Sequence, residues 1–240
     1  LLNFSGGLPD VLTLAHEAGH CMHTLYSNRQ PHADASYPIF LAEIASTVNE
    51  ILLIRRLMGA CDLSTPGGRA ERAFYVNRLI EEFRLTVFRQ TMFAEFEMVA
   101  HERAEAGEAL TAESLCGLYG ELLRLYFGPG VEIDDYMRWE WARIPHFYNA
   151  FYVFKYATGF SAAAAFCDRM EKEGAPAVRQ YLGFLGAGGS DYPLEILRAA
   201  GLDMTDSGPV RMGLAQFAGL VAELESLLDH VPDKMPATEA

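Results

Sequence analysis

Residues 12–23 read LTLAHEAGHCMH, and this stretch decides the fold and the site that the sequence predicts. Its apolar and histidine positions, beginning at Leu12, recur every three or four residues, as they do on one face of an α-helix. Asp10 is a suitable first residue for that helix. His16 and His20 lie one helical turn apart, so their imidazoles can converge on a single ion.

The five residues from His16 to His20 form an HExxH motif, which is typical of zinc peptidases. Glu17 lies beside the face that carries the two histidines, within reach of a water molecule on the metal. Zinc lowers the pKa of such a water towards 7, and a glutamate can take its proton as the oxygen attacks a carbonyl. The motif therefore predicts one zinc ion, Zn2+, on His16 and His20, with Glu17 as the general base.

A catalytic zinc site needs a third protein ligand. The candidates are the acids and histidines downstream of the motif: His23, His32, Asp34, Glu43 and Glu50. His23 lies too far along the same helix, and His32 and Asp34 fall in a predicted loop. Glu43 and Glu50 share one face of a second helix, predicted over 39–58, which a short connection would pack antiparallel to the first. The residues alone leave the choice between these two carboxylates open.

The remainder of the chain also has helical patterns. Helices are predicted over four further ranges: 69–104, 111–126, 193–200 and 210–230. Residues 139–173 are aromatic and then alanine-rich, with breaks expected at Pro145 and Gly159, and 186–190 should form a flexible loop or contact the substrate backbone. No alternating strands appear. The predicted fold is mostly α, a multi-helix domain in which the HExxH helix packs on the glutamate-bearing helix.

Composition narrows the function classes. The 240 residues carry 19 basic and 32 acidic side chains, a net charge of −13, so a nucleic-acid partner is not expected. No apolar run is long enough to cross a membrane, and no membrane partner is expected. Four scattered cysteines predict reduced thiols, and no secretory signal is visible, so we expect a cytoplasmic protein.

Four blocks of the sequence resemble the oligoendopeptidase F branch of the thimet-oligopeptidase family of zinc metallopeptidases. They are LLNFSGGLPDVLTLAHEAGH at 1–20, YPIFLAEIASTVNE at 37–50, IPHFY to YATG across 144–159, and GGSDYP at 188–193. The blocks occur in the family's order over nearly the whole chain. The resemblance implies a mostly helical peptidase with a deep channel, which cleaves oligopeptides rather than folded proteins.

The resemblance also implies roles for particular residues. The third zinc ligand of the family corresponds to Glu43. Glu50 would then be an acid that supports a ligand or has a structural role without binding the metal itself. A later segment supplies a histidine and tyrosines to the substrate carbonyl; the matching residues are His146, Tyr148, Tyr152 and Tyr156. The three tyrosines are spaced by four residues, which predicts one helical face. The thimet branch has a further tyrosine where this chain has Ala163, so the tyrosine that stabilises the intermediate is not identified.

Residues 1–240 are thus expected to form a catalytic domain that lacks the large N-terminal helical region of the family. The predicted function is a zinc-dependent metalloendopeptidase that hydrolyses short peptides. One alternative is a metallocarboxypeptidase with the same HExxH-plus-glutamate site. The other is an inactive helical module that only binds peptides. Cleavage of a blocked peptide would exclude the first, and a metal analysis beside a cleavage assay would decide on the second.

Overall fold

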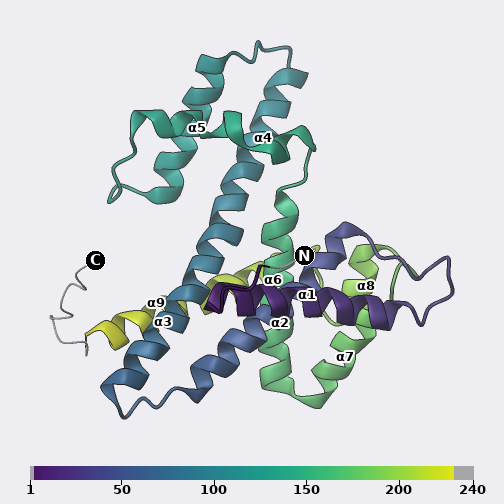
Figure 1. Cartoon of the computed structure of the whole chain (residues 1–240). Coiled ribbons are helices and arrows are strands. Elements are labelled where there is room, and N and C mark those ends of the chain that lie inside the picture. The colour runs from purple at the N-terminus through teal and green to yellow at the C-terminus, as the bar shows by residue number, and fades with distance from the viewer. Residues whose placement is uncertain (1–2, 230–240) are drawn as a thin grey trace. The chain divides into compact units, whose positions relative to one another are not determined.

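The structure is a computed structural model that describes residues 3–229. These residues form helices α1 to α9 with short π and 3-10 segments and no strand, so the prediction of a mostly α fold is confirmed (Figure 1). The chain divides into two compact units. Unit 1 comprises Leu1–Phe83 and Gly159–Ala240, and unit 2 comprises Arg84–Thr158. Each unit is described below by itself.

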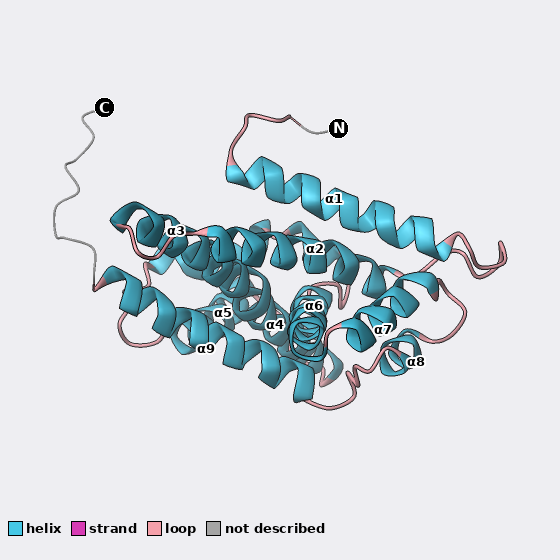
Figure 2. Ribbon diagram, turned by 90° about the horizontal axis from the view of Figure 1, so that it is seen from below, coloured by secondary structure: helices cyan, strands magenta, loops and turns pink. Residues whose placement is uncertain are grey.

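The first two helices of unit 1 form an antiparallel hairpin. α1 (Leu8–Ser27) and α2 (Ile39–Ala60) lie side by side (Figure 2). Thr24 of α1 contacts Tyr37 just before α2, whereas Ala15 contacts Asn49 further along it, so the helices run in opposite directions. The predicted packing of the HExxH helix on the glutamate-bearing helix is therefore present.

The start of α1 differs from the prediction. The helix begins at Leu8 rather than at Asp10, because the Asp10 carboxylate reaches back from inside the first turn. It accepts hydrogen bonds from the backbone N–H groups of Ser5 and Gly7, at 2.9 and 3.1 Å. An acid at this position satisfies backbone donors that the helix leaves free and complements the positive end of the helix dipole.

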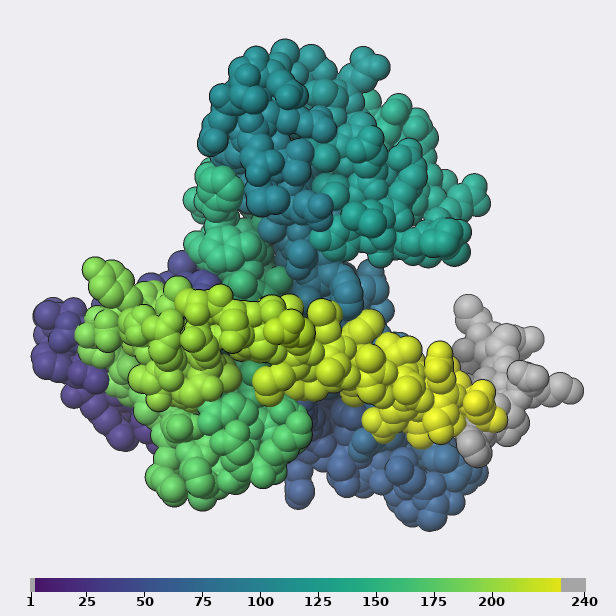
Figure 3. All heavy atoms as spheres, turned by 180° about the vertical axis from the view of Figure 1, so that it is seen from behind, coloured from purple at the N-terminus to yellow at the C-terminus, as the bar shows by residue number. Residues whose placement is uncertain are grey.

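Five further helices complete unit 1: α3 (Pro66–Phe83), most of α6 (Phe154–Glu173), α7 (Ala175–Gly186), α8 (Pro193–Ala199) and α9 (Gly208–Leu228). The expected break at Gly159 is wrong, since α6 continues through it into the fully buried alanines 162–165. α7 was not predicted. α9 packs on α3 and runs along the surface of the unit in yellow (Figure 3).

Unit 2 contains α4 (Arg89–Glu105) and α5 (Ala112–Phe127), which lie side by side (Figure 1). The single helix predicted over 69–104 is instead divided by a π-helical turn at Arg84–Phe88, between α3 and α4. Two 3-10 helices, η2 (Asp135–Arg143) and η3 (Pro145–Tyr148), follow α5. Their apolar side chains pack on an aromatic core that includes Phe93, Phe96 and Tyr119.

The cysteines and the helix hydropathy bear on the remaining expectations. All four cysteines are free. Burial raises the pKa of the Cys167 thiol to about 12, which makes it a poor nucleophile. Among residues 3–229, no helix has the length and apolar character needed to span a membrane.

Candidate metal centre

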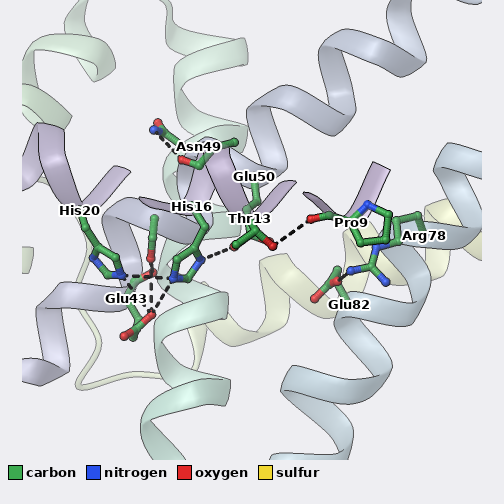
Figure 4. A network of polar contacts seen from close by, with 11 residues as sticks. Pro9, Thr13, His16, His20, Glu43, Asn49, Glu50, Arg78 and Glu82 are labelled. Atoms are coloured by element: carbon green, nitrogen blue, oxygen red, sulfur yellow. Dashed lines mark hydrogen bonds and ion pairs between the residues drawn. The ribbon is translucent and has the colours of Figure 1, made fainter. Parts of the chain in front are cut away.

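The two histidines of the motif and Glu43 bring three possible ligand atoms together (Figure 4). The Nε2 atoms of His16 and His20 lie 3.1 Å apart. Oε2 of Glu43 lies 3.4 Å from the His16 nitrogen and 3.7 Å from the His20 nitrogen. Within the described part of the chain, this is the one group of three such residues whose ligand atoms all lie within 4.8 Å of one another.

The spacing of these atoms fits a zinc ion. Ligand atoms about 2.0–2.1 Å from one ion, at the corners of a tetrahedron, lie about 3.3 Å from one another. The observed distances between the three ligand atoms, 3.1, 3.4 and 3.7 Å, are close to that value. Two imidazole nitrogens and a carboxylate oxygen are also a donor set that zinc uses in hydrolytic enzymes.

A glycine allows the two helices to approach closely enough to form this group. A Cβ atom on Gly19 would lie 2.5 Å from Cα of Ser46 and 2.7 Å from the carbonyl oxygen of Ala45. Any larger residue would push α1 away from α2 at this point. On α2, the crossing point lies between Glu43 and Glu50. It therefore brings both carboxylates close to the histidines of α1.

Glu43 and Glu50 approach different nitrogens of the His16 ring. Oε1 of Glu50 forms a short hydrogen bond with Nδ1, whereas Glu43 faces Nε2 (Figure 4). A proton held on Nδ1 by Glu50 leaves the Nε2 lone pair free for a metal. In this arrangement Glu43 belongs to the three-atom group, and Glu50 lies on the other side of the His16 ring, at Nδ1.

The electrostatics of the site favour positive charge. Hydrogen bonds to the carboxylates of Glu43 and Glu50 stabilise the doubly protonated ring of His16 and raise its pKa to about 10; a metal ion would replace the proton on Nε2. In return, the bond to His16 holds the pKa of Glu43 below its ordinary value. Two acids that stabilise a proton on an imidazole also stabilise a divalent cation at the same place.

Glu17 lies on α1 between the two histidines, and its side chain is exposed. A general base must meet both water and substrate, so exposure suits that role. Cys21, the next residue after His20, is also exposed and is not part of the three-residue group.

The other sequence candidates lie elsewhere in unit 1. His23 is buried, with its ring stacked on Tyr37 at 3.7 Å between centroids, and burial lowers its pKa to about 4. The backbone oxygen of Asp34 accepts a 2.7 Å hydrogen bond from the N–H of Gly189. A Cβ on Gly188 would lie 2.1 Å from that same oxygen. The glycine-rich loop 186–190 is thus packed against the α1–α2 connection, and no flexibility is needed to explain its glycines.

Unit 2 carries the second set of predicted residues and groups three of them. Oη of Tyr156 lies 3.3 Å from Nε2 of His146, and the Tyr152 ring stacks on the His146 ring at 5.7 Å. Tyr148 is 92% exposed. The expectation that the three tyrosines share one helical face is wrong, because η3 ends at Tyr148 and α6 begins only at Phe154.

Comparisons with known proteins agree with this architecture. The model of peptidase family M3 matches residues 1–216. The chain is 44% identical to oligopeptidase PepF of Bacillus subtilis over 96% of its own length and 34% of that protein. It is also 44% identical to the plasmid oligoendopeptidase F of Lactococcus lactis subsp. cremoris, over 95% of its length and 37% of that protein.

Two solved structures have the same fold. A crystal structure of oligoendopeptidase-F from Enterococcus faecium matches 92% of this chain and 40% of its own, with 42% identity and a TM-score of 0.81. A crystal structure of a putative peptidase from Chlamydophila abortus matches 95% of this chain and 38% of its own, with 43% identity and a TM-score of 0.86. The chain spans little more than a third of the curated relatives' length. The resemblance to oligoendopeptidase F is confirmed, and the chain belongs to peptidase family M3.

Proposed function

We propose that this chain carries the catalytic site of a zinc-dependent metalloendopeptidase that hydrolyses short peptides. The observation that supports it best is the group formed by His16, His20 and Glu43, whose spacing fits one zinc ion. Membership of peptidase family M3 supports the class of reaction. The names of the relatives, oligopeptidase and oligoendopeptidase, support short peptides as substrates and cleavage at internal bonds.

Each group of residues has a distinct role in this proposal. Zinc, when bound to His16, His20 and Glu43, would supply a Lewis acid that polarises the peptide carbonyl and acidifies water. Glu17 accepts the proton of the attacking water and passes it to the leaving amine. Glu50 holds the Nδ1 proton of His16 and so keeps the ring oriented.

The residues of unit 2 are proposed as hydrogen-bond donors to the carbonyl oxygen of the substrate. His146 is exposed, and Tyr156 and Tyr152 are half-buried beside it, so the cluster lies at the surface. A donor of this kind is worth about 3 kcal/mol of transition-state stabilisation. Tyr148, although outside the cluster, presents a freely accessible hydroxyl and stays a candidate.

Two broader expectations also stay proposals. We propose that residues 1–240 form a catalytic domain, which the match of the family model to residues 1–216 supports. We also propose a cytoplasmic location, which the four free cysteines support.

The test is the cleavage of a peptide that is acetylated at its N-terminus and amidated at its C-terminus. Zinc-loaded protein should cut it at an internal bond, as mass spectrometry of the fragments would show, whereas Glu17→Gln should bind zinc and leave it intact. Removal of single residues only from an unblocked C-terminus would indicate a carboxypeptidase. Peptide binding without cleavage, in protein that holds one zinc per chain, would indicate a binding module.

A further inference from the structure

Glu97 on α4 is unusual within unit 2. Among residues 3–229 it is the one acidic side chain that is buried, with 5% of its surface exposed. A carboxylate is costly to bury unless it is hydrogen-bonded. Its Oε1 accepts a hydrogen bond of 2.8 Å from the backbone N–H of Phe151. The neighbouring core is apolar and aromatic. The hydrogen bond to Phe151 therefore offsets part of the cost of burying this carboxylate.

Phe151 is itself unusual. Among the described residues it is the one non-glycine residue with a positive φ, at 55°. A residue with a large side chain adopts this left-handed conformation only when surrounding contacts hold it there. Two side chains of α4, one helical turn apart, provide such contacts. Glu97 binds the Phe151 backbone, and the ring of His101 lies 4.6 Å from the Phe151 ring.

The conformation at Phe151 determines how the chain turns between His146 and the tyrosines. The N–H of Tyr152 donates to the carbonyl oxygen of Asn149 at 3.1 Å, so the chain reverses at this point. The reversal brings Tyr152 onto the His146 ring and Tyr156 to its Nε2. A helix through the same residues would carry the tyrosines away from His146.

We infer that Glu97 is a positioning residue: by holding the backbone of Phe151 it sets His146, Tyr152 and Tyr156 as one cluster. The catalytic part of this inference rests on the proposed function, in which the cluster acts on the peptide carbonyl. The structural part does not depend on activity. Glu97 lies 49 residues before His146 in the chain, and its hydrogen bond is to the backbone of Phe151, so it acts through the backbone turn.

Three substitutions of Glu97 separate the acceptor from the charge and the volume. Glu97→Leu keeps most of the volume and removes the acceptor. Glu97→Asp keeps the charge but is one methylene too short to reach Phe151 in place. Glu97→Gln keeps an acceptor oxygen at full length. Glu95→Leu is the matched control, because Glu95 lies on the same helix and accepts a 2.8 Å hydrogen bond from Tyr126.

The first readout is the ring resonances of His146 in zinc-loaded protein, observed by NMR of histidine-labelled samples. Ring currents from Tyr152 and Tyr156 make these signals sensitive to the cluster. They should shift in Glu97→Leu and Glu97→Asp and stay near the wild-type positions in Glu97→Gln and Glu95→Leu. If Glu97→Leu does not fold, Glu97→Asp alone decides. Wild-type His146 signals in a folded Leu or Asp variant would overturn the inference.

The second readout is kcat on the blocked peptide, normalised to bound zinc. Glu97→Leu should lower kcat by about 10–100-fold, because small displacements of catalytic groups have effects of this size, while KM and zinc content stay near wild type. When Tyr156 is already replaced by Phe, Glu97→Leu should lower kcat by a much smaller factor. If the double variant loses kcat by the product of the two single-variant factors, the two residues act independently and the positioning role is contradicted. If wild type cleaves nothing, the proposed function fails, and the NMR result still decides whether Glu97 holds the cluster.

Discussion

The two groups of predicted site residues are built in different ways. The candidate metal site of unit 1 lies on two regular helices that cross at Gly19, and the spacing of its histidines follows from helical geometry. The His146 cluster of unit 2 takes His146 from a 3-10 helix and Tyr156 from the first turn of α6, and the connection between them holds Phe151 in a left-handed conformation. A regular element gives a position that sequence spacing predicts, whereas an irregular turn depends on distant contacts.

The largest expected effect concerns Glu17, the proposed general base beside the candidate metal site of unit 1. Glu17→Gln keeps the size of the side chain but cannot accept a proton, so kcat should fall by about 10²–10⁴-fold while bound zinc is unchanged. Steady-state kinetics beside a zinc assay would measure both quantities. Activity above about a tenth of wild type would show that Glu17 is not the base.

The second prediction separates the tyrosines of the second group. Tyr156→Phe should lower kcat by about 10²-fold, since its hydroxyl lies at His146 and a lost oxyanion donor costs this much. Tyr148→Phe is the matched change outside the cluster and should have a smaller effect. Kinetics of the two variants on one blocked peptide make the comparison. A larger loss in Tyr148→Phe would mean that the cluster seen here is not the donor group.

A third prediction concerns the acid behind the metal site. Glu50→Ala removes the partner of His16 Nδ1 and should weaken zinc affinity by about 10–100-fold, without abolishing it. Competition with a zinc chelator gives the affinity. Complete loss of the metal in Glu50→Ala, together with its retention in Glu43→Ala, would reverse the roles of the two acids.

The smallest expected effect tests how the helices of the first group come together. Gly19→Ala would place a Cβ 2.5 Å from Cα of Ser46, so α1 and α2 must separate. Overpacking of this kind costs about 1–3 kcal/mol of stability. Gly59→Ala is the matched control, because a Cβ there meets nothing within 4 Å. Urea unfolding of both variants would measure the difference, and equal stability would show that the close crossing is unimportant.

Much of the fold could be predicted from periodicity. The helix expected over 39–58 is observed at Ile39–Ala60, and the one expected over 111–126 at Ala112–Phe127. The break expected at Gly159 was wrong, because the buried alanines that follow stabilise α6 by packing, which outweighs the low helix propensity of one glycine.

The site was predictable only in part. Spacing predicts His16, His20 and Glu17 as site residues, but Glu43 and Glu50 lie two turns apart on one face, so the sequence cannot say which one faces Nε2 of His16. The structure distinguishes them by the nitrogen of His16 that each one contacts, Nε2 for Glu43 and Nδ1 for Glu50, and this arrangement depends on tertiary packing. The cluster of unit 2 was predicted with the wrong geometry, since no local signal reveals a positive φ at Phe151 or its bond to Glu97.

The most direct test of the central claim is a crystal structure of the zinc-loaded protein, with zinc identified by anomalous scattering. The claim is that His16, His20 and Glu43 hold one zinc ion. The account predicts a carboxylate oxygen of Glu43 about 2.0–2.2 Å from the ion, with Nε2 of both histidines at similar distance and Glu50 on Nδ1 of His16. Zinc bound by Glu50 with Glu43 turned away, or bound outside this group, would contradict it.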